Sequence, residues 1–182
     1  MTESLPATVF VMDEVVSVQT HSERTVIESF DTEFERLHAR SCKLIETTPF
    51  EILYGDLHAN SDSASVGVFI LRSAGVVEQT CGGITSNLWD APFEWTLPET
   101  LSTSARVIEY LSEVEETRKH AFACFAGDGD LLKKIATPSG EMRPLISLLL
   151  DTLVRALGFQ GRAVALLATV SQDFLSARQQ NS

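Results

Sequence analysis

The segment that most constrains the fold is the long stretch Leu145–Val170, which is apolar around nearly its whole circumference. Apolar residues at helical spacing over this length predict one long helix. Four residues that interrupt the apolar surface, Asp151, Arg155, Gly158 and Arg162, recur at steps of four, three and four, so they share one helix face. A buried helix with opposite charges on one face either holds a structural ion pair or lines a pocket. The charges would be costly in lipid, so we expect a core helix and no membrane partner.

Three earlier segments, residues 22–46, 65–88 and 102–125, also repeat their apolar residues at steps of three and four, the amphipathic helix pattern. Thr20 and Glu23 resemble a capping box, which places the first helix start near residue 21. Gly82 and Gly83 indicate either a break in the second helix or a close approach to its backbone. Without a convincing series of strands, these four segments predict an all-α four-helix bundle.

The bundle is expected to span residues 21–175, with an N-terminal arm or tail at 1–20 and a disordered tail at 176–182. Residues 1–18 are rich in β-branched side chains, which fits a tail, a short strand or an arm packed on a partner. Residues 89–101 form a proline-containing apolar loop that holds both Trp89 and Trp95. That loop either covers a pocket or seals one end of the core.

Charge and cysteine content limit the function classes. The formal net charge of −11 argues against nucleic-acid binding and against docking on anionic lipid. Cys42, Cys81 and Cys124 are odd in number and show no CxxC spacing, which fits reduced thiols in a cytoplasmic protein. Cys81 lies on an apolar stripe without a nearby histidine in the sequence, so a core role is favoured over a nucleophilic one.

Three motif regions carry a family resemblance: Ser65-Val66-Gly67-Val68-Phe69-Ile70-Leu71-Arg72, then residues 111–131, then residues 137–161, which end in Gln160-Gly161. In this order they resemble the DinB-like (YfiT-like) superfamily of four-helix bundles, over roughly residues 22–172. Members of that family typically bind a divalent metal through three histidines, and they associate as homodimers. The resemblance therefore implies a similar fold and a homodimer.

The three motif positions that would carry the metal ligands are occupied by Arg72, Arg155 and Phe159, and none of these side chains can ligate a metal. The resemblance thus implies a divergent member without the family metal site, and no cofactor is expected. The histidines, at positions 21, 38, 58 and 120, lie elsewhere and fit surface positions. A relocated metal site built from Glu78, Asp151 and His58 is the alternative.

Without the metal, the same region supports two interpretations. In one, Arg72, Asp151 and Arg155, with Glu78, form a charge cluster that pins the second helix to the fourth. In the other, the two arginines form a pocket for a small anionic ligand, because a guanidinium binds carboxylate or phosphate through two hydrogen bonds. The candidate ligand-binding residues are Arg72, Asp151, Arg155, Phe159, Glu78, Trp89 and Trp95.

These interpretations of the sequence lead to two hypotheses about function. The first is a metal-free bundle that acts as a small-molecule-binding or interaction protein. The second is an enzyme related to the family's metal-dependent thiol transferases and hydrolases, working through a rebuilt site in the same cleft.

Overall fold

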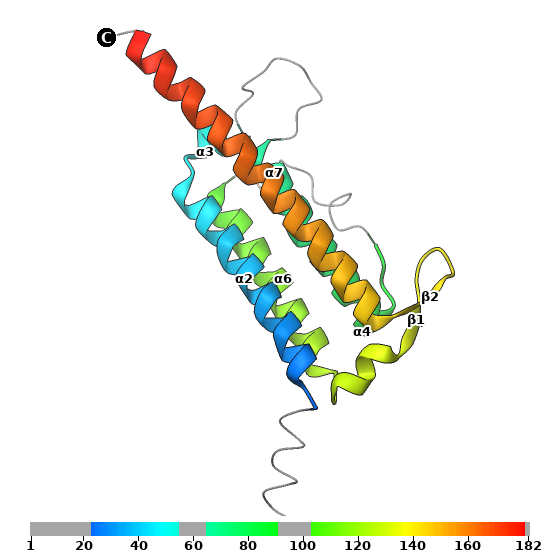
Figure 1. Ribbon diagram of the computed structural model, residues 1–182. Coiled ribbons are helices and arrows are strands. Elements are labelled where there is room, and N and C mark those ends of the chain that lie inside the picture. The colour runs from blue at the N-terminus through cyan, green and yellow to red at the C-terminus, as the bar shows by residue number, and fades with distance from the viewer. Residues whose placement is uncertain (1–22, 55–64, 91–102, 181–182) are drawn as a thin grey trace, which may run out of the picture.

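A computed structural model describes residues 23–54, 65–90 and 103–180, with side chains up to residue 170. It contains four long helices packed against each other, which confirms the expected all-α four-helix bundle (Figure 1). The long helices are α2 (Thr25–Thr47), α4 (Val66–Ser86), α6 (Ser104–Ala123) and α7 (Leu145–Gln180). Short elements complete the described chain: α3 (Phe50–Tyr54), the 3-10 turn η1 (Asp128–Leu132) and an antiparallel hairpin of β1 (Lys134–Ala136) and β2 (Met142–Pro144). Residues 137–141 form the turn of this hairpin, and Gly140 supplies its positive φ of 79°.

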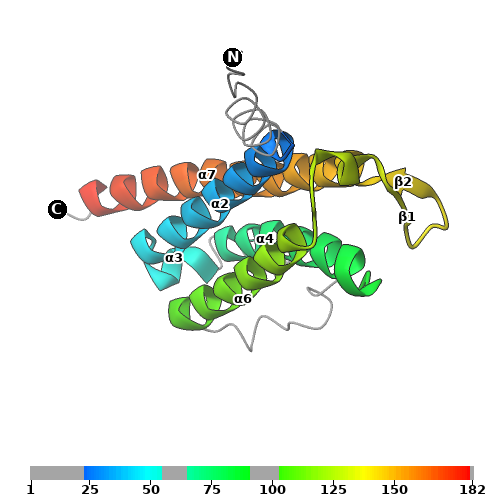
Figure 2. The same ribbon diagram turned by 90° about the horizontal axis from the view of Figure 1, so that it is seen from below.

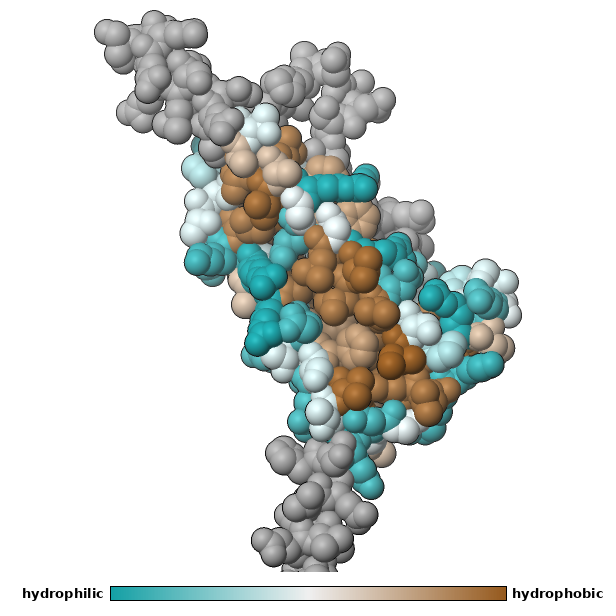
Figure 3. Space-filling view, in the orientation of Figure 1, coloured by the Kyte–Doolittle hydropathy of each residue, from teal (hydrophilic) through white to brown (hydrophobic). Residues whose placement is uncertain are grey.

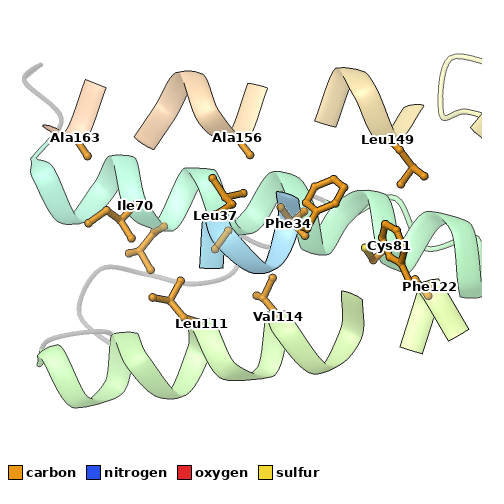
Figure 4. Packing of buried hydrophobic residues seen from close by; sticks show 14 of the residues in the cluster. Phe34, Leu37, Ile70, Cys81, Leu111, Val114, Phe122, Leu149, Ala156 and Ala163 are labelled. Atoms are coloured by element: carbon orange, nitrogen blue, oxygen red, sulfur yellow. The ribbon is translucent and has the colours of Figure 1, made fainter. Parts of the chain in front are cut away.

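The four long helices form the core by turning one apolar face each toward the centre. Helix α4 packs against α7 on one side and α6 on the other, while α2 packs mainly on α6 and also touches α7 (Figure 2). Figure 4 shows how their side chains meet along the middle of the bundle. The labelled core residues are Phe34, Leu37, Ile70, Cys81, Leu111, Val114, Phe122, Leu149, Ala156 and Ala163.

Buried polar contacts fix how α7 is rotated about its own axis. Gln160 donates from Nε2 to the carbonyl oxygen of Leu37 at 3.0 Å and to Ser41 Oγ at 2.9 Å, both on α2. On the α4 side, the hydroxyls of Thr80 and Thr152 lie 2.7 Å apart, as a second buried contact. Because a buried polar group without a partner is costly, these contacts disfavour any other rotation of α7.

Helix α2 begins at Thr25 rather than near residue 21, so the start predicted from a capping box is wrong. The reason is a cap supplied from another part of the chain. The carboxylate of Asp128, in η1, accepts from the backbone N–H groups of Val26 and Ile27, each at 3.0 Å. These amides have no intrahelical partner, and a carboxylate also favours the positive end of the helix dipole. Thr20 lies outside the described residues.

The double glycine in α4 marks a close approach and not a break, which decides between the two interpretations of the sequence. A Cβ on Gly83 would lie 2.5 Å from the ring of Trp89, so the indole sits directly on the helix backbone. The helix ends at Ser86, where Asn87 takes a left-handed conformation with φ 55°. Trp89 is held there because Gln79 Nε2 donates to its carbonyl oxygen at 2.7 Å.

Replacing the distant cap tests this account of the α2 start. Asp128→Ala should lower the free energy of unfolding by about 1 kcal/mol, because two first-turn amides of α2 lose their acceptor. Urea denaturation followed by circular dichroism measures the change. The control is Glu141→Ala, at an exposed side chain in the hairpin, and it should leave stability nearly unchanged. Equal effects of the two substitutions would contradict the capping role.

Candidate functional site

The most unusual surface of the protein is the side of α7 that faces away from the bundle, here called the outer face of α7. It consists of apolar and small residues that are exposed although the helix belongs to the core on its other side. Its members are Leu150, Val154, Leu157, Gly158, Gly161, Val164, Ala165 and Ala168. Figure 3 shows a large brown patch on this side of the molecule, bordered by white and hydrophilic residues.

The exposure of these side chains is large. Leu150 is 53% exposed, Val154 61% and Val164 48%. Single exposed apolar residues are ordinary, but a contiguous apolar patch on a monomer usually marks a binding surface. The sequence predicted a helix that is buried on most sides. The structure shows that this holds for one side of α7 only.

The outer face has the spacing of a helix-packing surface. Leu150, Val154, Leu157, Gly161 and Val164 recur at alternating steps of four and three, the pattern of a seam that receives another helix. A Cβ built on Gly158 or on Gly161 meets no atom within 4 Å, so the backbone there is open to close approach. Small residues at such positions let a second chain pack tightly.

The polar stripe predicted from the sequence lies along one edge of the outer face. Arg155 and Arg162 are exposed, and the Arg162 guanidinium lies 5.7 Å from the centre of the Phe159 ring. Asp151 pairs with Arg143 of β2 at 3.7 Å, and not with Arg155 as its spacing suggested. The edge of the outer face therefore carries exposed positive charge, and the anion pocket at these residues stays a prediction.

The remaining candidates lie on or beside α4. Arg72 is exposed on that helix, and Trp89 packs on Gly83 as described above. Glu78 accepts a 2.6 Å hydrogen bond from the hydroxyl of Tyr110 on α6. Trp95 lies outside the described residues. These three candidates thus contact different partners: Glu78 contacts Tyr110 on α6, Trp89 packs on α4, and Asp151 pairs with β2.

Glu78 also lines a groove of about 730 Å³ between α4 and α6. Asp90, Glu116 and His120 contribute exposed side chains to the same groove, which gives it an acidic character. Burial raises the pKa of Glu78, the hydrogen bond from Tyr110 lowers it, and Glu113 raises it further, with a net upward shift. Burial and the neighbouring Glu78 carboxylate likewise raise the pKa of Tyr110, so its hydroxyl remains a donor.

Because the folded protein raises the pKa of Glu78, its charged form costs stability, and this cost appears as the pH rises through the folded pKa. Glu78→Gln keeps an oxygen that can accept from Tyr110 and removes the charge. The variant should therefore be as stable as the original protein below the ordinary glutamate pKa and slightly more stable at neutral pH. Urea denaturation at pH 4 and pH 7.5 measures both differences. The stability of the Gln variant is compared with that of the original protein at each pH. If this difference is less favourable to the variant at pH 7.5 than at pH 4, the pKa of Glu78 is not raised by folding.

The structure contains a buried charge cluster that the sequence reading missed. Arg118 on α6 is 3% exposed, and it donates from Nε and Nη2 to the Glu115 carboxylate at 2.8 and 2.7 Å. Its Nη1 also bonds Asp31 on α2, so the cluster joins these two helices. A signal was present, because Arg118 falls four residues after Val114 and four before Phe122, on the apolar stripe of that helix.

A small cavity of about 20 Å³ lies beside the cluster, large enough for one water. Glu115, Arg118 and His38 line it together with apolar side chains from α2, α4 and α6. His38 Nε2 lies 3.5 Å from the sulfur of Cys42 on the same helix. A histidine beside a cysteine can activate the thiol as a nucleophile, so the pKa of Cys42 decides whether this pair is reactive.

The environments of Cys42 and Cys81 do not favour a nucleophilic thiolate. Burial, followed by the charges of Glu46 and Glu115, raises the pKa of Cys42, which keeps the thiol protonated. Burial raises the pKa of Cys81 to about 12, and its side chain is part of the core cluster. The core role expected for Cys81 is therefore confirmed.

Breaking the buried cluster tests its structural role. Arg118→Met should lower the free energy of unfolding by about 3–5 kcal/mol, because the carboxylate of Glu115 is then left buried without a partner. The double variant Arg118→Met, Glu115→Leu should recover much of that loss. Urea denaturation of both variants measures the difference. If the double variant is less stable than the single one, the cost does not come from an unpaired buried charge.

No group of three or more histidine, cysteine, aspartate or glutamate side chains that would hold a metal occurs among the described residues. Of the relocated metal site considered from the sequence, Glu78 bonds Tyr110 on α6 while Asp151 pairs with Arg143 on β2. His58 lies outside the described residues.

Within the described part of the chain, one helical segment, Leu145–Val170, is long and apolar enough by length and composition to cross a membrane. The core helix of a soluble protein passes the same test when it is mostly buried, whereas 22% of the apolar window in this segment is buried in the bundle. Here Leu149, Ala156 and Ala163 of this segment are buried in the bundle.

Comparisons with known proteins add no further restraint. No protein family matches this chain, and neither a curated protein nor a solved structure matches it. The helical bundle is shown by the structure itself, and the DinB-like assignment remains a resemblance of the sequence motifs.

Proposed function

We propose that this protein is an interaction protein that uses the outer face of α7 to hold an apolar, acidic polypeptide segment. The observation that carries the proposal is the exposed apolar band along a helix whose opposite side is fixed in the core. Alternating steps of three and four suit an amphipathic helix laid along the band. The arginines at its edge favour a partner with acidic side chains beside its apolar ones.

The positive edge is local, because the whole chain carries a formal net charge of −11. A surface with exposed Arg155 and Arg162 therefore differs in sign from the protein as a whole. This difference selects among partners, since like charges brought together across an interface oppose binding. A second copy of the chain, as in the homodimer implied by the resemblance, stays a prediction.

The alternative is an enzyme with a rebuilt site at Arg72, Asp151 and Arg155. Asp151 is about half exposed and the two arginines are exposed, whereas catalytic groups usually work in a concave site that excludes water. Stoichiometric zinc or nickel in protein purified without chelators would favour the enzyme and contradict the metal-free interaction protein.

A charge placed on the outer face tests the proposal. Val154→Asp should leave stability within about 0.5 kcal/mol of the original, because residue 154 is exposed. In extracts of cells that naturally make the protein, the original chain should elute with a larger apparent mass than the purified chain. The Val154→Asp chain should lose this added mass. Size-exclusion chromatography with antibody detection measures both.

The matched control is Ser112→Asp, which places the same side chain at an exposed site on α6. It should elute with the original protein. If Val154→Asp and Ser112→Asp elute alike, the outer face of α7 is not the binding surface.

A further inference from the structure

We propose that residues 1–22 of this chain cover the outer face of α7 within the same molecule and are displaced when a partner binds. This inference rests on the proposed function, and it concerns how access to the surface is regulated. Three features of the segment support this role: the place where it is attached, its length, and the side chains that it carries.

The segment is attached beside one end of the outer face. Gln160 of α7 bonds Leu37 and Ser41 of α2, which sets the level of the two helices against each other. Both helices run in the same direction in Figure 1. Moving eleven residues toward the N-terminus along each helix places Val26 near the level of Leu149. Residues 1–22 therefore join the bundle at the level of Leu150, where the outer face begins.

The segment is long enough to cover the face. At about 1.5 Å per residue, the helix from Leu150 to Ala168 measures about 27 Å. Residues 1–22 reach about 33 Å as a helix, by the same rise, and about 70 Å when fully extended. Either conformation spans the whole outer face from its attachment point.

The composition of the segment matches the surface. Residues 1–22 contain an apolar set rich in valine, namely Leu5, Val9, Phe10, Val11, Met12, Val15, Val16 and Val18. They also contain Glu3, Asp13 and Glu14, and no lysine or arginine. An apolar, acidic segment is the chemistry that an apolar face edged by Arg155 and Arg162 would bind. A second copy of α7 packed antiparallel would instead place its own arginines along the same edge, where like charges oppose binding.

Binding of an apolar sulfonate probe, 8-anilinonaphthalene-1-sulfonate, to the full chain tests whether the face is covered. The arm variant carries Val9→Ser, Phe10→Ser and Val11→Ser. If the segment occupies the face nine-tenths of the time, this variant should bind the probe about tenfold more tightly than the original. The control variant, Ser4→Ala, Thr8→Ala and Ser17→Ala, should bind like the original.

A face variant, Leu150→Ser with Val154→Ser, locates the probe. Added to the arm variant, it should abolish the gain in affinity. If the arm variant has no effect while the face variant weakens binding to the original chain, the face is already open. The arm inference then fails and the proposed function stands. If the arm variant gains affinity and adding the face substitutions does not remove this gain, the arm inference and the proposed function both fail. Both also fail if the face substitutions change probe binding neither in the original chain nor in the arm variant.

Two further measurements identify a different occupant. Light scattering of the purified full chain should give a monomer mass. A dimer that the face variant or the arm variant dissociates would overturn the intramolecular arrangement. Co-sedimentation with phosphatidylcholine and phosphatidylglycerol vesicles should be absent, and sedimentation that the face variant removes would show that a lipid surface covers the face.

Discussion

The arrangement of this bundle depends on the buried hydrogen bonds that fix the rotation of α7. Gln160 reaches the α2 backbone, and Thr152 meets Thr80 on α4, in places where water is excluded. Rotating the helix to bury its outer face would break the bonds of Gln160 to α2 and separate Thr152 from Thr80, although each of these two hydroxyls also bonds a carbonyl oxygen of its own helix. Burying these apolar side chains in the bundle would gain free energy, so the outer face lies outside the core because the loss of these contacts and of the existing core packing opposes the rotation.

The same constraint explains what the sequence could and could not reveal about α7. Apolar periodicity identified the helix and its approximate start, because the pattern records local geometry. It could not tell which of two apolar sides faces the core, since Leu149 and Leu150 are equally apolar and lie on different sides. The deciding residues are polar ones, Gln160 and Thr152, whose partners lie on helices far away in the sequence.

Other differences between sequence and structure have the same origin. The start of α2 was misplaced because its cap, Asp128, lies in another element. The Arg118 cluster was missed although Glu115 lies only three residues before Arg118, and its pairing with Asp31 becomes visible only after α2 and α6 are side by side. The close approach at Gly83 was one of two alternatives that the sequence indicated, because a glycine pair inside a helix is a local signal that does not distinguish a close approach from a break. Features set by neighbouring residues were predictable, and features set by long-range contacts were not.

The cap on α2 also bears on how the chain folds during its synthesis. Asp128 is separated from the amide of Val26 by 102 residues. At about 5–20 residues per second, a ribosome needs about 5–20 seconds to add the intervening chain. For most of this interval α2 has neither its cap nor its main neighbour α6, and α7 is made later still. A chaperone that binds nascent chains would thus find the apolar side of α2 unprotected until about two thirds of the protein has been made.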